Sequence, residues 1–188
     1  LCTKDTSRAN QLAQLLGKTN KERQQVMFQA TEHASLSVKE RKVLKKLLIV
    51  SHDTYPEGVI GLVAGRLVEE YYRPAIVIAK GQETSKGSVR SVNGFNIIEF
   101  LRSASEYFIN VGGHPMAAGF TVETENIEKL QEALEEMAEG LLDDATLTRT
   151  LRIDAVLPFS VISPDLYQAI QSISPFGMGN PDATFASE

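Results

Sequence analysis

The residues best suited to chemistry lie in the run 112–119, which reads Gly-Gly-His-Pro-Met-Ala-Ala-Gly. Gly112 and Gly113 let backbone N–H groups approach a ligand without interference from a Cβ atom, and the small residues that follow leave room for a substrate. His114 could donate a hydrogen bond to a phosphate oxygen or titrate near neutral pH. The alternative is an ordinary turn in which backbone groups satisfy the histidine. The run makes Gly112, Gly113 and His114 candidate substrate-binding residues.

A second candidate lies in residues 87–91, Gly-Ser-Val-Arg-Ser. Because successive side chains of a strand point to opposite faces, Ser88 and Arg90 would project together from one face. The guanidinium supplies planar donors and the hydroxyl a shorter one, which suits a phosphodiester. An arginine on a half-exposed strand can also be an ion-pair partner or remain solvated. The binding interpretation gains weight if this strand and the glycine–histidine run converge on one groove.

The sequence offers no self-sufficient catalytic centre. Its three histidines are His33, His52 and His114, and none has the spacing or the neighbouring cysteine of a common zinc site. Only His52 and Asp53 form a local couple that a divalent ion could use, and we interpret this couple as structural. A P-loop, a Gly-x-Ser-x-Gly elbow and a dinucleotide-binding fingerprint are also absent from the sequence. We therefore expect no metal to be bound by this chain.

The composition is that of a globular protein, with 43% hydrophobic and 23% charged residues in a chain of 188. It excludes collagen-like, disordered and coiled-coil classes. No apolar run approaches the roughly 20 residues of a membrane span, and the N-terminus lacks the regions of a signal peptide. The single cysteine suits a reducing compartment. We expect a soluble, cytoplasmic protein without membrane contact, and, since the first residue is leucine, a piece of a longer chain.

The net charge of −5 conceals a gradient along the chain. Residues 1–46 hold ten basic and four acidic residues, residues 47–120 hold six and seven, and residues 121–188 hold three and thirteen. The last segment would repel a polyanion, so any contact with nucleic acid is expected in the first two. The alternative is that both charged ends are solvated helix faces.

Helices and strands alternate in the first three quarters of the sequence. Helical spacing of apolar residues and capping residues predict helices over 7–33, 39–46, from Pro56 to about 72, from 97, and over 124–142. Apolar runs predict strands at 47–50, 75–79, 87–92 and 116–122, the middle two forming an antiparallel hairpin. Glycines at 58, 61 and 65 would line one helix face, as expected for close packing on a sheet or a bound group. The predicted fold class is α/β, a mixed sheet flanked by helices.

Three segments are expected along the chain. Residues 1–46 would form connector helices, and residues 47–142 the α/β domain. Residues 143–188 change character: an alternating strand at 151–156, a short helix capped by Ser163, and a proline- and glycine-rich loop at 175–181. This segment is expected to be a linker and the start of a second, β-rich domain.

Five motifs together resemble the RecJ family of bacterial single-strand-specific DNA exonucleases, in the DHH phosphoesterase superfamily. They occupy residues 57–64, 73–77, 87–91, 112–119 and 175–181. Their order and spacing match across about residues 1–185. The first four belong to the DHH-associated domain of that family and the last to the start of its OB-fold domain. The family often has Trp-His where this chain has Tyr55 and Pro56.

The resemblance implies a division of labour. In the family, two divalent ions, usually Mn²⁺ or Mg²⁺, are held by a preceding DHH domain that is joined through a long helix. The motifs of that domain do not occur here, so the fragment alone is expected to be inactive while it grips single-stranded DNA for the DHH domain of the same chain. Ser88, Arg90, Ser91, Gly113 and His114 match the substrate-gripping motifs. The whole protein would digest DNA from the five-prime end in repair and recombination.

Two other functions remain open at this point. One is an oligonucleotide or cyclic-dinucleotide phosphodiesterase of the DHH superfamily, which would share the Gly-Gly-His run but lack the OB segment; residues 151–188 favour the exonuclease. The other is a non-catalytic interaction module that uses the acidic helix 124–142 as its partner surface.

Overall fold

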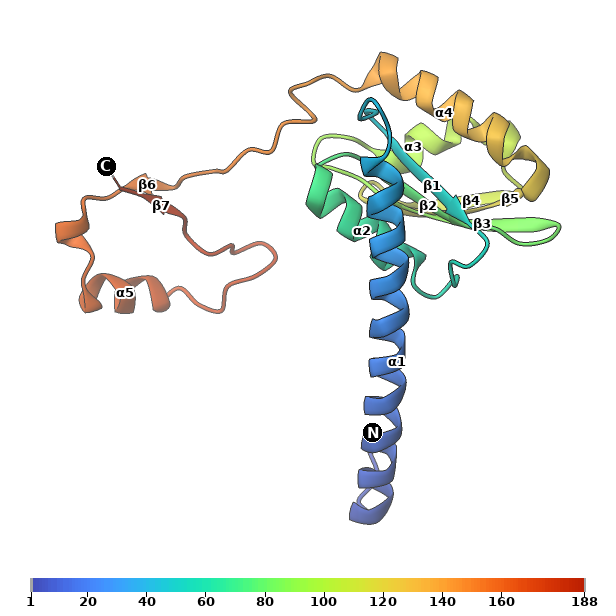
Figure 1. The fold of residues 1–188 in the computed structure, drawn as a ribbon. Helices are drawn as coiled ribbons and strands as arrows, with labels where there is room; N and C mark the ends of the chain where they lie inside the picture. The colour runs from blue at the N-terminus through green and yellow to red at the C-terminus, as the bar shows by residue number, and fades with distance from the viewer. Residues whose placement is uncertain (1, 188) are drawn as a thin grey trace. The chain divides into compact units, whose positions relative to one another are not determined.

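The computed structural model describes residues 2–187, which divide into two compact units at Thr148 and Arg149. The first unit holds the α/β domain and the N-terminal helix (Figure 1). The second unit holds the remaining residues. Within residues 2–187 no helix is at once long enough and apolar enough to cross a membrane.

The centre of the first unit is a five-stranded mixed sheet with the order β1-β2-β3-β5-β4. The strands are β1 (Leu48–His52), β2 (Ala75–Ala79), β3 (Thr84–Arg90), β4 (Asn110–His114) and β5 (Ala117–Glu123). β1 and β2 are parallel and every other pairing is antiparallel. The predicted mixed sheet and the antiparallel β2–β3 hairpin are therefore confirmed, although β3 spans Thr84–Arg90 and not the expected 87–92.

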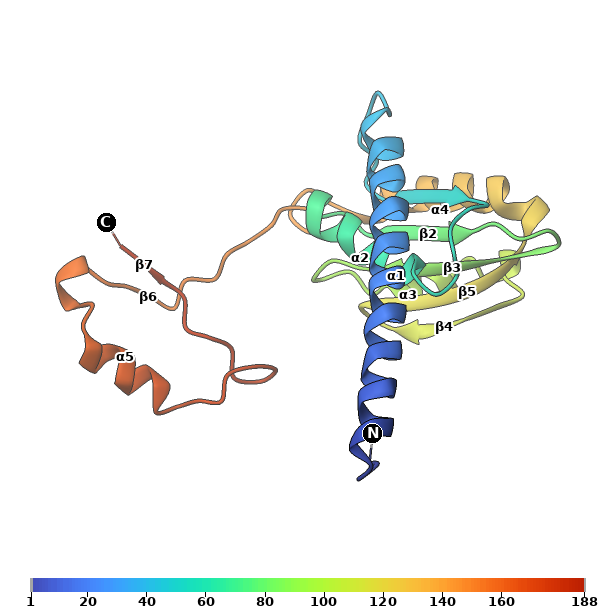
Figure 2. The ribbon, with the colours of Figure 1, turned by 60° about the horizontal axis from the view of Figure 1, so that its bottom comes forward.

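Helices cover both faces of this sheet. They are α1 (Thr6–Lys39), α2 (Ile60–Tyr71), α3 (Ile97–Arg102) and α4 (Ile127–Leu141), with the short turns η1 (Ser105–Tyr107) and η2 (Thr124–Asn126). The end of α1 and all of α2 pack on one face, and α3 and α4 pack on the other. In Figure 2, α1 crosses in front of the sheet and α4 lies behind it.

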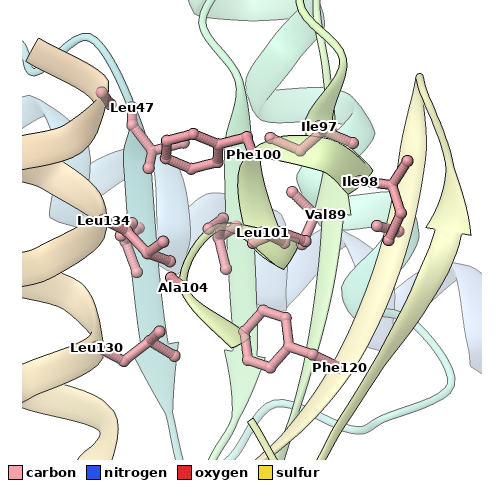
Figure 3. Packing of buried hydrophobic residues seen from close by; sticks show 14 of the residues in the cluster. Leu47, Val89, Ile97, Ile98, Phe100, Leu101, Ala104, Phe120, Leu130 and Leu134 are labelled. Carbon is pink, nitrogen blue, oxygen red and sulfur yellow. The ribbon is translucent and has the colours of Figure 1, made fainter. Parts of the chain in front are cut away.

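Alternating burial along the strands divides the core in two. All five residues of β2 are buried, because Val77 and its alternating neighbours pack under α1 and α2 while Ile76 and Ile78 pack under α3 and α4. Figure 3 shows the second cluster, in which Leu130 and Leu134 of α4 face the sheet. Each fully buried aliphatic side chain stabilises the fold by about 1.5–3 kcal/mol. The sheet that positions the site is covered by helices on both faces at β1 and β2.

The N-terminal region differs from the prediction of two helices. α1 continues unbroken to Lys39, because Ala30, Ala34 and Val38 keep packing on α2 and β1, and residues 41–46 are not helical. The basic side chains expected on a second helix are used as tethers instead. Arg41 donates to the carbonyl oxygen of Ile49, and Lys46 Nζ donates to the carbonyl oxygen of Leu142 at 2.6 Å.

Two further boundaries shift. The helix expected from Pro56 begins only at Ile60, after a turn. The acidic helix expected from residue 124 begins at Ile127, after η2. The helix predicted from residue 97 is confirmed as α3, and the Asn96 side chain caps it by accepting from the Glu99 N–H at 3.5 Å.

The second unit is small and thinly packed. It contains β6 (Ala155–Val156), β7 (Phe185–Ala186), η3 (Phe159–Val161) and α5 (Pro164–Gln171). The predicted cap at Ser163 is confirmed. The strand expected over 151–156 shrinks to β6, because none of the described residues of this unit is buried and nothing covers the alternating apolar side chains.

Candidate phosphate-binding groove

An open groove of about 480 Å³ lies on the α2 side of the sheet. The start of α2 and the turn before it form one wall, and β3, β5 and β4 supply the rest. Its lining includes Glu57, Gly61, Lys86, Ser88, Arg90 and Gly119. The groove exists because α2 packs over β1, β2 and β3 but does not extend over β5 and β4. On this face of the sheet the outer strands are therefore left open beside the helix.

Strand register determines which side chains share the floor of this groove. Opposed residues of antiparallel strands project to the same face, so each cross-strand row acts as a unit. Three rows cross β3, β5 and β4: Arg90–Ala117–His114, Ser88–Gly119–Gly112 and Lys86–Thr121–Asn110. Arg90 and His114 thus lie on one face, two strands apart, a separation of about 10 Å. Ala117 lies between them, and the next row continues from Ser88 with Gly119 and Gly112, so small residues keep the floor of the groove low.

Ser88 and Arg90 lie together as the alternation predicted. Arg90 Nη1 is 3.5 Å from Ser88 Oγ and donates to the carbonyl oxygen of Val89 at 2.9 Å. Within residues 2–187 no carboxylate pairs with the Arg90 guanidinium, so the ion-pair alternative for this arginine is not what the structure contains. A Cβ atom on Gly61 would lie 3.0 Å from Ser88 Oγ and 3.1 Å from Arg90 Nη2. Of the three α2-region glycines, Gly61 is the one that lets the helix approach this pair.

The Gly-Gly-His run does not form the ordinary turn that was its alternative interpretation. It is most of the edge strand β4, joined to β5 by the Pro115–Met116 turn. Gly113 has φ +150°, and a Cβ atom there would lie 2.5 Å from both the Ala117 oxygen and the Ala118 Cα. A Cβ atom on Gly112 would meet nothing within 4 Å. The two glycines therefore differ: Gly113 permits the pairing of the hairpin, while Gly112 leaves open space on the groove face.

His114 and Ser91 take different places relative to the groove. His114 is exposed and shares its face with Arg90, although it is not part of the groove lining. Ser91 is buried, its Oγ donates to the Phe95 carbonyl oxygen at 2.6 Å, and its N–H donates to the Met116 oxygen at 3.0 Å. Ser91 thus supports the turn that carries His114 and does not reach the groove.

Four further residues line the groove without having been predicted as site residues: Glu57, Lys86, Asn110 and Thr121. Lys86 could have been found, because it lies two residues before Ser88 and alternation puts it on the same face. Asn110 and Thr121 reach this face only through the register of β4 on β5, which leaves no signal in the sequence. Lys86 Nζ lies 3.2 Å from Glu57 Oε2, so the described part of the groove carries one paired and one unpaired cation.

A separate cluster of rings joins the end of β1 to α1. His33 Nδ1 lies 2.7 Å from the Tyr55 hydroxyl, and the His33 and His52 ring centroids are 4.5 Å apart. His52 Nδ1 is 2.9 Å from Asp53 Oδ1. Burial raises the pKa of Tyr55 to about 12, so its hydroxyl stays protonated at neutral pH. Among residues 2–187 no three His, Cys, Asp or Glu side chains are grouped to hold a metal ion. The cluster ties α1 to the sheet.

Two family models match the chain. Residues 42–140 match the DHHA1 domain, and residues 153–188 match the RecJ OB domain. The first match spans the sheet, the groove and α4. The second covers the segment that separates the exonuclease interpretation from the small-nucleotide phosphodiesterase interpretation.

Two curated relatives align with nearly the whole chain. The single-stranded-DNA-specific exonuclease RecJ of Bacillus subtilis (strain 168) is 34% identical over 183 residues, 96% of this chain and 23% of that protein. The RecJ of Thermus thermophilus is 30% identical over 192 residues, 98% of this chain and 26% of that protein. The crystal structure of RecJ in complex with Mg²⁺ from Thermus thermophilus matches with a TM-score of 0.85 at 27% identity, covering 98% of this chain and 28% of that chain. The chain spans about a quarter of the length of these relatives.

Proposed function

Since the chain belongs to the DHHA1 domain family and continues into a RecJ OB domain, we propose that it is the substrate-gripping part of a RecJ-type single-stranded-DNA-specific exonuclease. The observation that carries the proposal is the unpaired guanidinium of Arg90 beside Ser88 in an open groove. Phosphate oxygens accept hydrogen bonds from both groups. The bond from the charged guanidinium is stronger than a bond from a neutral donor. The groove has a low floor and an open side, which suits an extended single strand.

The chain's share of the reaction is binding and orientation. Arg90 offsets the charge of a phosphodiester and Ser88 fixes one of its oxygens, which positions the scissile bond without bond-making by this chain. Crystal structures of RecJ contain Mg²⁺ or Mn²⁺, whereas the described residues 2–187 offer no fitting ligand set. A divalent ion of the complete enzyme would therefore be held by a DHH domain outside residues 1–188, and this chain would be inactive alone. We place the complete enzyme in the cytoplasm, digesting DNA from its five-prime end during repair and recombination.

The segments of the chain follow from this proposal. Residues 1–46, of which α1 is the largest part, would connect the DHH domain to the groove, and residues 47–142 would be the DHH-associated domain. Residues 143–188 would be the linker and the start of the OB-fold domain. Gly112, Gly113 and His114 would flank the bound strand from the β4 side, while Ser91 would act only by holding the turn behind them.

Binding of a fluorescent oligothymidylate to the chain, followed by anisotropy over a range of salt concentrations, tests the proposal. We expect single strands to bind more tightly than a duplex. Arg90→Ala should weaken single-strand binding about ten- to hundredfold, since a hydrogen bond to a charged group contributes roughly 1.5–3 kcal/mol. The slope of log affinity against log salt should fall by about 0.7.

Arg102→Ala is the matched control, because Arg102 is exposed on α3, on the opposite face of the sheet. It removes the same charge from the chain and should leave the affinity within about twofold. Equal losses in the two variants would mean that binding responds to net charge and not to the groove, which would contradict the proposal.

A further inference from the structure

The groove contains a third cross-strand row that the grip on one phosphate does not use. Lys86, Thr121 and Asn110 lie in register across β3, β5 and β4, and all three line the same groove as Ser88 and Arg90. They supply an ammonium, a hydroxyl and a carboxamide, and each of these groups can donate a hydrogen bond to a phosphate oxygen. The side chains of this row can therefore bind an anion.

The distance between the rows matches a nucleic-acid strand. Residues two apart on an antiparallel strand are separated by about 7 Å, so Lys86 lies this distance from Ser88 along β3. Adjacent phosphates of an extended single strand are separated by a similar length. A strand that runs along β3 with one phosphate at Ser88 and Arg90 would place its neighbouring phosphate at Lys86.

The present partner of Lys86 does not prevent such binding. Its side chain is 55% exposed and the Glu57 side chain 62% exposed, with 3.2 Å between Nζ and Oε2. Exposed pairs of this kind contribute at most about 1 kcal/mol, because water screens them and ordering two long side chains is unfavourable. A phosphate that enters the groove can replace the Glu57 carboxylate as the partner of the Lys86 ammonium. Glu57 then becomes a nearby negative charge that weakens binding.

We propose that Lys86, with Thr121 and Asn110, forms a second phosphate subsite, so that the groove holds two consecutive phosphates of a single strand lying along β3. This inference rests on the proposed function, because it requires Ser88 and Arg90 to hold the first phosphate. It goes further in fixing the line of the strand relative to the sheet and in requiring a ligand with at least two phosphates.

The test compares two ligands of the chain by NMR-detected titration: thymidine 5′-monophosphate, with one phosphate, and the 5′-phosphorylated thymidine dinucleotide, with two. Lys86→Ala should weaken dinucleotide binding roughly tenfold and leave mononucleotide binding unchanged. Arg90→Ala should weaken both. Glu57→Gln should tighten dinucleotide binding roughly two- to fivefold, because it removes the competing carboxylate.

Lys129→Ala is the matched control, since Lys129 is exposed on α4 on the other face; it should change neither affinity. Lys86→Arg, which keeps the charge, should retain most of the dinucleotide affinity. If Lys86→Ala weakens neither ligand, or both equally, the second subsite is wrong while the first stands. If the dinucleotide binds and Arg90→Ala affects neither ligand, the proposed function itself has the wrong site.

Discussion

Arg90→Ala is expected to lower kcat/KM for single-stranded DNA about ten- to hundredfold in a full-length enzyme that carries this chain. A charge-assisted phosphate contact contributes on the order of 1.5–3 kcal/mol, and each 1.4 kcal/mol corresponds to about a factor of ten. The melting temperature should stay unchanged, because among residues 2–187 the Arg90 side chain contacts only Ser88 Oγ and the Val89 oxygen by hydrogen bonds and pairs with no carboxylate. Steady-state kinetics with Mn²⁺ and a thermal melt of each variant are the two measurements.

The same pair of measurements separates binding from structure. Arg102→Ala, on the other face of the sheet, should leave both the kinetics and the melt unchanged. A loss of activity in Arg90→Ala that runs parallel to a loss of thermal stability would assign Arg90 to the fold, and unchanged kinetics would remove it from the site.

Gly113→Ala is expected to destabilise the first unit by about 2–4 kcal/mol. The added Cβ atom would lie 2.5 Å from the Ala117 oxygen and the Ala118 Cα, and the backbone at φ +150° disfavours a side chain. Backbone strain and overpacking each cost roughly 1–3 kcal/mol, and neither obstacle is the movable end of a flexible side chain. The measurement is urea unfolding followed by circular dichroism.

Gly112→Ala supplies the control for this prediction. It changes the neighbouring glycine of the same strand, where an added Cβ atom meets nothing within 4 Å. Its effect on stability should stay within about 0.5 kcal/mol. Equal destabilisation by the two substitutions would mean that the close approach of β4 and β5 at Gly113 does not constrain the fold.

The sequence was sufficient to predict features that are set within one strand or one helix. Period-two alternation placed Ser88 and Arg90 on one face, and a continuous apolar run identified the buried β2. It could not predict β4, because its two glycines have low strand propensity and the strand exists only through pairing with β5. Register across three strands also decides that His114, Thr121 and Asn110 share a face with Arg90.

Errors at single positions have equally physical causes. Ser91 matched a motif as a neighbour of Arg90, but alternation turns it away from the groove, where its hydroxyl bonds to Phe95. The basic residues 41–46 suit a helix face, yet Arg41 donates to the carbonyl oxygen of Ile49 in β1 and Lys46 to that of Leu142, after α4. The Ser91 contact is local, whereas the role of Lys46 depends on a residue 96 positions later in the chain.

Photocrosslinking tests the central claim that the groove on β3, β5 and β4 holds the single strand. An oligothymidylate containing 4-thiothymidine would be bound to the chain and irradiated, and the crosslinked peptides would be mapped by mass spectrometry. We expect crosslinks in residues 57–62, 84–90 and 110–121, and their loss in Arg90→Ala. Crosslinks confined to residues 149–188 or to α4 would contradict it, because the strand would then lie on the second unit or on the opposite face of the sheet.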